Sequence, residues 1–280
     1  MTTQISIGAL TIANDVPLTI IAGPCVMESR QHAFDMSGVL AEIAVKLQVG
    51  MIYKSSFDKA NRTSATGERG LGLDAALQVF ADIRKETGLP VLTDVHEAGH
   101  CAAVADAVDV LQIPAFLCRQ TDLLVAAADA AVRRNICVNI KKPQFVAPED
   151  TVYAVRKCDA RGLQNVLLTD RGTTFGYGRL VNDFRCIPIM QEFGVPVVYD
   201  ATHSVQLPGG ATTGGQHKMV FPLARAAVAA GADAVFFETH PHPAQAMSDG
   251  PNMVPLDRAA RLVQELSAIR KVMLDLSDAG

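Results

Sequence analysis

The chain has 280 residues, of which 49% are hydrophobic and 19% charged, so it can bury a large core in one α/β domain. Its formal net charge of −4 provides no broad basic surface, which argues against nucleic acid as a partner. No apolar run has the length of a membrane span, and the N-terminus lacks the features of a signal peptide. The six cysteines contain no C-x-x-C pair, which is typical of reduced thiols. We therefore expect a cytoplasmic protein that contacts neither nucleic acid nor membrane.

The predicted elements begin with a short β-hairpin within residues 1–15, where two apolar triplets flank Gly8 and Ala9. Eight short aliphatic or β-branched runs follow, and they predict strands at 18–23, 51–56, 90–95, 110–114, 136–141, 165–170, 196–200 and 234–238. Segments with helical spacing lie between them, for example at 31–49, 73–87, 120–134, 149–161 and 221–230.

Strands that are apolar throughout and alternate with helices indicate a parallel sheet covered on both faces. Eight such units predict a (β/α)₈ TIM barrel, formed by residues 1–280 as one domain, with the hairpin at its bottom. The alternative is an open doubly wound sheet, but no G-x-G-x-x-G motif follows the first strand.

Polar residues accumulate at the C-terminal ends of the predicted strands, which is the end of a TIM barrel that carries the functional residues. Five cations belong to this set: Lys54, Lys59, Arg62, Lys141 and Arg171. Guanidinium and ammonium groups that converge in this way predict a pocket for ligands bearing phosphate or carboxylate. The loop after the second strand adds hydroxyl groups from Ser56, Thr63 and Ser64.

Four further residues each follow an apolar run: Cys25, His203, Glu238 and Asp249. Any one of them alone would be interpreted as a buried structural residue. A thiol, an imidazole and two carboxylates at one end of a barrel together predict a site for a divalent transition metal. Mn, Fe, Zn, Co and Cd would all accept this mixture of ligands, so the sequence leaves the identity of the ion open.

The segment His96-Glu97-Ala98-Gly99-His100 matches the H-E-x-x-H pattern of zinc proteases. That chemistry requires both histidines on one face of a regular helix. Here the first histidine ends a strand and Gly99 disfavours a helix, so we expect no protease site.

Several longer motifs carry a resemblance that covers nearly the whole chain. They are Ile21-Ala-Gly-Pro-Cys25, Lys54-Ser-Ser-Phe-Asp-Lys-Ala-Asn-Arg-Thr-Ser64, Thr93-Asp-Val-His-Glu97, Gln112-Ile-Pro-Ala-Phe-Leu-Cys-Arg-Gln-Thr-Asp122, Asn139-Ile-Lys-Lys-Pro-Gln-Phe145, Asp170-Arg-Gly-Thr-Thr-Phe-Gly-Tyr177 and Asp200-Ala-Thr-His-Ser-Val-Gln206. With these motifs the chain resembles the 3-deoxy-D-manno-octulosonate 8-phosphate synthase family.

The resemblance implies condensation of phosphoenolpyruvate with D-arabinose 5-phosphate and release of phosphate, in lipopolysaccharide inner-core biosynthesis. It implies a homotetramer. By family similarity, phosphoenolpyruvate would be held by Lys54, Ser56, Lys59, Gln112, Lys141 and Arg171. The sugar phosphate would be held by Asn61, Arg62, Thr63, Ser64 and, from a neighbouring subunit, Arg119.

The family has metal-dependent and metal-independent branches, which carry Cys and Asn, respectively, at the position of Cys25. Cysteine therefore implies the metal-dependent branch, with His203, Glu238 and Asp249 as the other ligands. We expect Cys25, Lys141, His203 and Asp249 to act in catalysis.

Two alternatives remain at this point. One is the related 3-deoxy-D-arabino-heptulosonate 7-phosphate synthase, which uses erythrose 4-phosphate and typically has Lys-Pro-Arg-Thr where this chain has Lys59-Ala-Asn-Arg-Thr63. Asn61 favours the five-carbon sugar. The other is a non-catalytic module that binds sugar phosphates, which would be expected to lack some of the catalytic cations and ligands.

Overall fold

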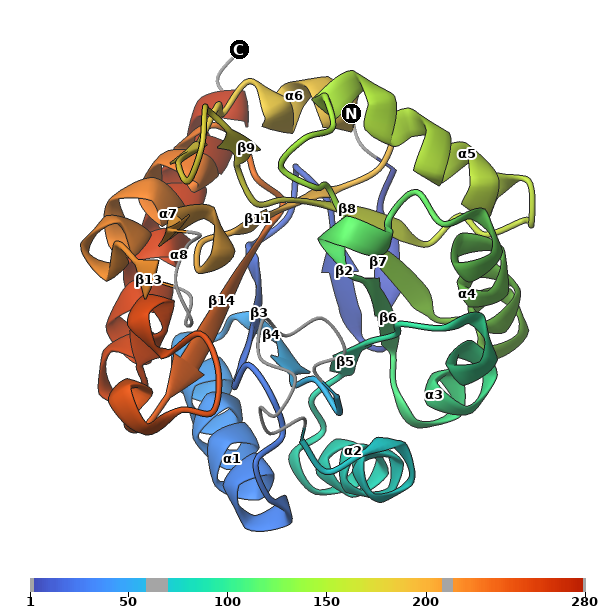
Figure 1. The fold of residues 1–280 in the computed structure, drawn as a ribbon. Helices are drawn as coiled ribbons and strands as arrows, with labels where there is room; N and C mark the ends of the chain where they lie inside the picture. The colour runs from blue at the N-terminus through green and yellow to red at the C-terminus, as the bar shows by residue number, and fades with distance from the viewer. Residues whose placement is uncertain (1–2, 59–69, 208–213, 279–280) are drawn as a thin grey trace.

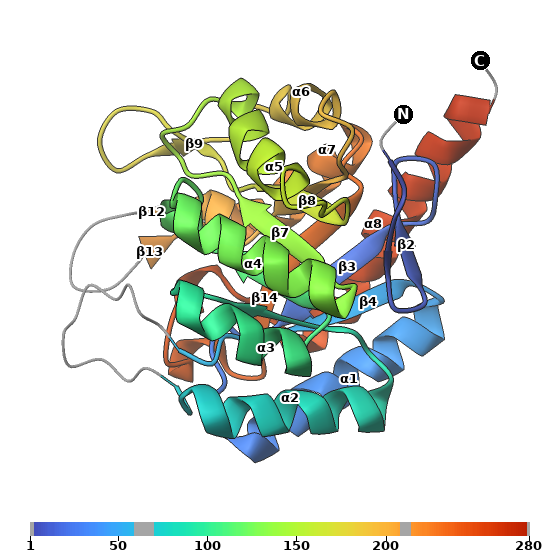
Figure 2. The same ribbon diagram turned by 90° about the vertical axis from the view of Figure 1, so that its right-hand side faces the viewer.

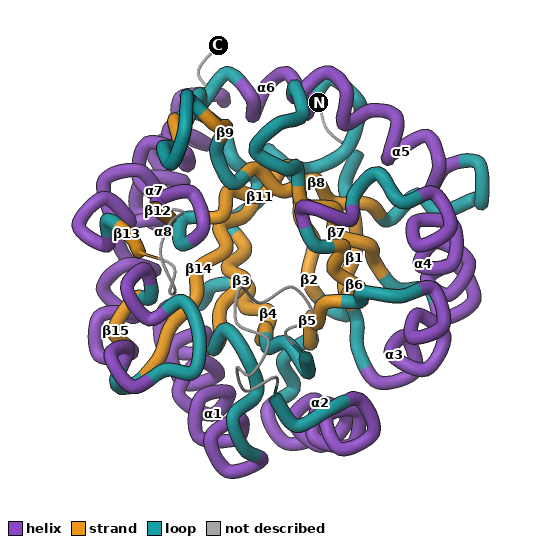
Figure 3. The backbone as a smooth tube through the Cα atoms, viewed as in Figure 1, coloured by secondary structure: helices purple, strands orange, loops and turns teal. Residues whose placement is uncertain are grey.

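A closed ring of eight parallel strands dominates the computed structural model, which describes residues 3–58, 70–207 and 214–278 (Figures 1 and 3). The ring consists, in order, of β3 (Thr19–Gly23), β4 (Gly50–Lys54), β5 (Val91–Asp94), β6 (Val110–Ile113), β7 (Cys137–Lys141), β8 (Val166–Asp170), β11 (Val197–Asp200) and β14 (Ala234–His240). Strand β14 pairs with both β11 and β3, which closes the ring. The predicted (β/α)₈ barrel is confirmed.

Helices surround the ring of strands (Figure 1). In the described segments they are α1 (Arg30–Leu47), α2 (Leu73–Thr87), α3 (Cys101–Ala107), α4 (Thr121–Arg134), α5 (Val152–Asp159), α6 (Cys186–Gln191), α7 (Val220–Ala229) and α8 (Leu256–Asp278). Short strands extend the loops: β9 (Thr173–Thr174) pairs with β10 (Leu180–Val181), β12 (Gln206–Leu207) with β13 (Gly214–Gly215), and β15 (Val254–Pro255) with β14. Among the described helices, none combines the length and apolar character needed to cross a bilayer.

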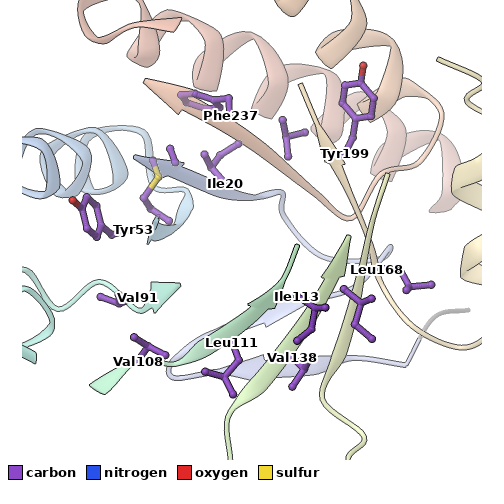
Figure 4. Packing of buried hydrophobic residues seen from close by; sticks show 14 of the residues in the cluster. Ile20, Tyr53, Val91, Val108, Leu111, Ile113, Val138, Leu168, Tyr199 and Phe237 are labelled. Carbon is purple, nitrogen blue, oxygen red and sulfur yellow. The ribbon is translucent and has the colours of Figure 1, made fainter. Parts of the chain in front are cut away.

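The barrel strands are apolar throughout because both of their faces are buried. Ile20 and Phe237 belong to the large cluster between strands and helices (Figure 4), whereas the neighbouring Ile21 and Phe236 belong to the cluster inside the barrel. Successive side chains of a strand point to opposite faces, so each strand supplies both clusters.

The predicted N-terminal hairpin is also present, formed by β1 (Ile5–Ile7) and β2 (Leu10–Ile12). It lies at the opposite end of the barrel from β9, β12 and β13 (Figure 2). Ile5, Ile7 and Ile12 join the inner apolar cluster. The buried guanidinium of Arg270 in α8 donates to the carbonyl oxygens of Ala13 and Val16, at 2.7 and 2.9 Å, and so fastens the chain that leaves the hairpin.

The helices deviate from the predicted segments in two ways. Helix α5 begins at Val152 rather than 149 because Pro148–Thr151 forms a 3₁₀ turn. Helices α3 and α6, with 7 and 6 residues, lie outside the predicted segments because they are too short to show helical periodicity. Helix α8 also lies outside them and completes the eighth unit.

Candidate active site

Two layers of inward-facing side chains fill the barrel. The apolar layer contains Ile21, Ile52, Leu92, Val110, Cys137, Leu167, Val198 and Ala234. Two residues further along the same strands, and therefore again facing inward, lie Gly23, Lys54, Asp94, Gln112, Asn139, Thr169, Asp200 and Phe236. All but Gly23 and Phe236 are polar, and all are buried. We call this second set the inner polar layer; it places functional groups at the C-terminal ends of the strands.

Lys54 joins three strands of this layer. Its Nζ lies 2.7 Å from Glu238 Oε1 on β14 and donates to the carbonyl oxygen of Cys25 at 3.0 Å. A Cβ at Gly23 would lie 1.9 Å from the Lys54 carbonyl oxygen, so only glycine allows this close approach of β3 to β4. The cation and the carboxylate are both buried, and each neutralises the other.

A second charged group centres on Asp200 at the end of β11. Its Oδ2 lies 2.6 Å from Lys141 Nζ and 2.8 Å from His203 Nδ1. Burial alone would raise the pKa of the Asp200 carboxyl, but His203 and Lys141 outweigh burial and hold this pKa well below its ordinary value. Lys141 Nζ also lies 4.0 Å from the centre of the Phe236 ring, so the ammonium is partly shielded from water.

Three of the four predicted metal ligands meet at one point. The Cys25 Sγ and one carboxylate oxygen each of Glu238 and Asp249 all lie within 4.8 Å of one another, and Cys25 Sγ is 3.2 Å from Asp249 Oδ2. The fourth, His203, has its Nε2 3.8 Å from Glu238 Oε1. Asp249 has a left-handed backbone (φ 54°), and Gln206 Nε2 donates to its Oδ1 at 2.8 Å.

The tautomer of His203 suits a metal ligand. Ionised Asp200 can only accept, so His203 Nδ1 must donate the proton between them. Neutral His203 then carries its lone pair on Nε2, the nitrogen nearer to Glu238. A carboxylate behind a ligating histidine is common in metal sites because it fixes the tautomer. The donor set therefore fits a divalent transition metal such as zinc.

A second cluster has the right residue types for a metal but the wrong tautomer. Glu28, His32 and His240 each place a donor atom within 4.8 Å of the others. The backbone N–H of His242 donates to His240 Nδ1 at 3.0 Å, so the ring proton resides on Nε2, which lies 3.3 Å from Glu28 Oε1. A metal would have to displace that proton. We interpret the cluster as a structural support, because Glu28 Oε1 accepts a hydrogen bond from Met247 N at 3.1 Å, two residues before Asp249.

Hydrogen bonds between side chains connect the other strands of the inner polar layer. Asp94 Oδ1 accepts from Gln112 Nε2 at 2.6 Å, and Gln112 Oε1 accepts from Asn139 Nδ2 at 2.9 Å. Asn139 Oδ1 in turn accepts from Thr169 Oγ1 at 2.6 Å, and the Ser56 hydroxyl donates to Asp94 Oδ2. We call Asp94, Gln112, Asn139 and Thr169 the amide chain; it extends from β5 to β8.

Arg171 is buried beside the proposed metal ligands. One guanidinium nitrogen donates to the carbonyl oxygen of His203 at 3.0 Å and to Gln206 Oε1. Its Nε is also buried and has no hydrogen-bond partner among the described residues, which a bound anion could supply. Lys142 supports this loop, since its Nζ lies 3.1 Å from Asp170 Oδ1 and donates to the Gly172 carbonyl oxygen at 3.3 Å.

Known proteins resemble this chain over nearly its whole length. The DAHP synthetase I family matches residues 2–274. The 2-dehydro-3-deoxyphosphooctonate aldolase of Chelativorans sp. (strain BNC1) is 58% identical over 271 residues, which covers 96% of this chain and 97% of that protein. Proteins of the same name from Nitrobacter winogradskyi and Brucella ovis are 59% and 56% identical, over 94% and 96% of this chain and 92% and 96% of their own lengths. The chain belongs to the DAHP synthetase I family.

Several sugar-phosphate residues predicted for this member of the DAHP synthetase I family fall outside the described residues. They are Asn61, Arg62, Thr63 and Ser64, and Lys59, which was predicted to bind phosphoenolpyruvate, also lies outside the described residues. Arg119 is described and is exposed, beyond the 3₁₀ turn Ala115–Leu117 that follows β6. It therefore lies outside the buried layer that contains Lys54, Gln112 and Lys141.

The H-E-x-x-H segment forms no regular helix, as expected. Ala98–His100 is a 3₁₀ turn, and His96 and His100 each pack edge-on against Phe57, with ring centroids 5.9 Å apart in both pairs. The two histidines therefore share an aromatic contact.

Four residues of the site in the described structure were not predicted from the sequence: Asn139, Thr169, Asp200 and Gln206. The first three could have been found from strand alternation, since each lies two residues beyond an inward-facing apolar residue. Gln206 lies on the loop strand β12 and gives no comparable signal.

Proposed function

We propose that the protein condenses phosphoenolpyruvate with D-arabinose 5-phosphate and water, giving 3-deoxy-D-manno-octulosonate 8-phosphate and inorganic phosphate. The observation that carries this proposal is the 56–59% identity, over at least 94% of the chain, to proteins named 2-dehydro-3-deoxyphosphooctonate aldolase, another name for the same synthase. The relatives favour this reaction over the heptulosonate alternative. The reaction would place the enzyme in lipopolysaccharide inner-core biosynthesis.

The charges of the site support two anionic substrates. Lys54, Lys141 and Arg171 reach the same end of the barrel, although Lys54 and Lys141 are each paired with a carboxylate in the described structure. Phosphoenolpyruvate carries a phosphate and a carboxylate, which guanidinium and ammonium groups bind through charge-assisted hydrogen bonds. The buried Nε–H of Arg171 is one donor for such a group.

The reaction needs one C–C bond, one water and one C–O cleavage. The enol C3 of phosphoenolpyruvate attacks the aldehyde carbon of the sugar, and the aldehyde oxygen takes up a proton. Water adds to the cationic C2 and loses a proton, and the resulting hemiketal phosphate expels phosphate to leave the ketone. Bringing C3 and the aldehyde together supplies much of the rate. Lys54 and Lys141 stabilise negative charge as it develops nearby.

Cys25, His203, Glu238 and Asp249 would hold the divalent metal. When bound, such an ion polarises an oxygen of the substrate as a Lewis acid. Asp200 keeps the proton on His203 Nδ1, so the lone pair on Nε2 serves either the ion or a proton of the reaction, and not both at once. The two roles therefore predict different pH profiles with and without metal.

The substrate assignment is tested by phosphate release from phosphoenolpyruvate with each aldose phosphate. We expect turnover with arabinose 5-phosphate that exceeds turnover with erythrose 4-phosphate by at least about a hundredfold, which corresponds to roughly 2.7 kcal/mol. Equal rates with both sugars would contradict the assignment. No release with either sugar, in a metal-supplemented and folded sample, would contradict the synthase function itself.

The metal assignment is tested by Cys25→Asn and by chelation. The thiolate is the softest ligand of the set, so its loss should weaken binding of Zn²⁺, Co²⁺ or Cd²⁺, measured as bound metal per chain and as the Co²⁺–thiolate absorption band. We expect the variant to keep some chelator-resistant turnover, because the cations of the pocket are unchanged.

A matched control is Cys101→Ala. Burial raises the pKa of the Cys101 thiol to about 11, so it remains protonated and should leave metal binding unchanged. Full activity of the wild-type protein after verified removal of metal would overturn the metal proposal. Cys25 would then be a small buried side chain at the end of β3.

We further propose a cytoplasmic homotetramer in which Arg119 of one subunit reaches the sugar phosphate of its neighbour. The exposure of Arg119 supports this role. Sedimentation equilibrium tests the assembly. Mixed oligomers of Arg119→Ala and a second inactive variant, Lys141→Met, test the shared site, because complementation between subunits should restore part of the activity.

A further inference from the structure

The amide chain has a direction that one residue determines. An ionised carboxylate can only accept hydrogen bonds, whereas a primary amide donates from nitrogen and accepts at oxygen. Asp94 therefore requires the nitrogen of Gln112 to face it, at the observed 2.6 Å. The oxygen of Gln112 must then face Asn139 and accept from its nitrogen, and the oxygen of Asn139 must accept from Thr169.

Turning over the Gln112 amide alone would lower the stability of the folded protein. If the Gln112 amide were turned over, its oxygen would face the Asp94 carboxylate with no proton between them, and its nitrogen would face the nitrogen of Asn139. Asp94, Gln112, Asn139 and Thr169 are all buried, so water could not compensate for the lost bonds. Each unsatisfied buried polar group costs on the order of 1–3 kcal/mol.

The direction decides which atom of Gln112 lies on each side of the barrel. The amide nitrogen carries two protons, and in the described structure Asp94 accepts one of them. The other proton belongs to the same atom, on the β5 side of the amide. The oxygen, which would repel an anion, lies on the β7 side and accepts from Asn139.

We propose that Asp94 is a positioning residue: through the amide chain it fixes Gln112 with its N–H, rather than its carbonyl oxygen, on the β5 side of the barrel, where that N–H serves an anionic substrate. The inference rests on the proposed function, because phosphoenolpyruvate is the anion concerned. The proposal gives a reason for the carboxylate of Asp94 in a pocket that binds anions, because its charge orients the N–H donor of Gln112.

The test exchanges the two ends of the Gln112 contact. The double variant combines Asp94→Asn with Asn139→Asp. At position 94 the amide would accept a hydrogen bond from Ser56 and donate one to Gln112 Oε1. At position 139 the carboxylate would accept hydrogen bonds from Gln112 Nε2 and from Thr169. The net charge is unchanged, every bond of the chain has a counterpart, and the amide is held in the opposite sense. Asp94→Asn alone removes only the charge and permits either direction.

We expect the exchange to raise KM for phosphoenolpyruvate by about tenfold or more, because an N–H that faces an anion is replaced by a lone pair. The KM for arabinose 5-phosphate should stay within about twofold, and Asp94→Asn alone should show an intermediate effect. Thr151→Val is the matched control: it removes the hydrogen bond of another buried threonine, to the carbonyl oxygen of Pro148 outside the site, so it should leave both KM values within about twofold.

An unchanged KM for phosphoenolpyruvate in the exchanged protein would overturn the inference, as would equal losses for both substrates. Failure of the proposed function looks different, because the wild-type protein itself would then release no phosphate. If the variants do not fold, neutron diffraction of deuterated wild-type crystals decides the matter. Deuterons on the Gln112 end that faces Asp94 would support the inference, and deuterons facing Asn139 would overturn it.

Discussion

The inner polar layer has two halves that are built differently. From β11 through β14 and β3 to β4 the charged members of the layer are ion-paired: Lys54 with Glu238 of β14, and Asp200 with Lys141 of β7. From β5 to β8 it is the amide chain, in which Asp94 supplies the one charge. Ion pairs have little directional preference, so a bound anion or metal can replace one partner. Amides have two distinct ends and lose a bond when they turn.

The difference predicts different roles for the two halves. The four proposed metal ligands lie beside the ion-paired half, and the charges of that half can be redistributed when a ligand binds. The amide half keeps its shape and presents donors in fixed places. Removing Lys54 from the first half takes the ammonium group away from a buried carboxylate, whereas removing Thr169 from the second half takes a neutral donor away from a buried amide.

The largest effect should come from Lys54→Met. Glu238 would remain buried without its cation, which typically costs about 3–5 kcal/mol of stability. The free energy of unfolding in urea measures the loss. Lys46→Met, at an exposed position of α1, is the control and should change it by less than about 0.5 kcal/mol. A loss of under about 1 kcal/mol for Lys54→Met would remove the energetic contrast between the halves.

Glu28→Ala should weaken metal binding by about 10- to 100-fold, as is typical for groups that support metal ligands. Glu28 ties the loop that carries Cys25 to the loop that carries Asp249, through its bond with Met247 N. Competition with a chromophoric chelator gives the dissociation constant. Glu42→Ala, on the exposed face of α1, should bind metal like the wild-type protein. An unchanged metal affinity in Glu28→Ala would show that the metal site does not depend on the hydrogen bond between these two loops.

Thr169→Val should destabilise the protein by about 1–2 kcal/mol, since it removes a single neutral donor and leaves Asn139 Oδ1 without it. Chemical unfolding measures this change as well. If Thr169→Val lowered the free energy of unfolding as much as Lys54→Met does, the two halves would contribute equally to stability, contrary to the prediction.

The smallest effect concerns a buried carboxylate outside both halves, Asp233, which precedes β14 and has hydrogen bonds but no ion pair among the described residues. It accepts from Val197 N and Gln191 Nε2, at 2.6 and 2.8 Å. Burial raises the pKa of Asp233 to about 6, whereas the pKa of the equally buried Asp200, which contacts His203 and the ammonium group of Lys141, is lowered. Cations, rather than hydrogen bonds alone, keep buried carboxylates ionised here.

The sign of the pH effect follows from this raised pKa. Between the unfolded pKa near 3.8 and the folded pKa near 6, the native state binds more protons, so this group adds stability as the pH falls and loses it as the pH rises through 6. Relative to Asp233→Asn, the wild-type protein should gain about 1 kcal/mol between pH 7.5 and pH 5. Parallel stability curves for the two proteins would contradict the raised pKa.

The sequence predicts the barrel well because its signal is repeated eight times, and each apolar run bounded by turn residues marks a strand with both faces buried. It also predicts Cys25, Glu238 and Asp249 as neighbours, since parallel strands bring their ends together. Two features do not follow from pattern. The left-handed backbone that turns Asp249 toward Cys25 depends on loop geometry, and the direction of the amide chain depends on contacts between strands that are 18 and 27 residues apart in sequence.

The N-terminal hairpin gives the barrel a floor. Ile5, Ile7 and Ile12 pack beneath the apolar layer with at most 2% of their surface exposed, so apolar side chains seal this end of the barrel. The buried charges of the inner polar layer are thereby separated from solvent on the hairpin side, and ligands reach them from the C-terminal ends of the strands. The isoleucines of the hairpin thus help to keep the charged groups in a medium of low dielectric constant, although they lie at the end of the molecule where no chemistry takes place.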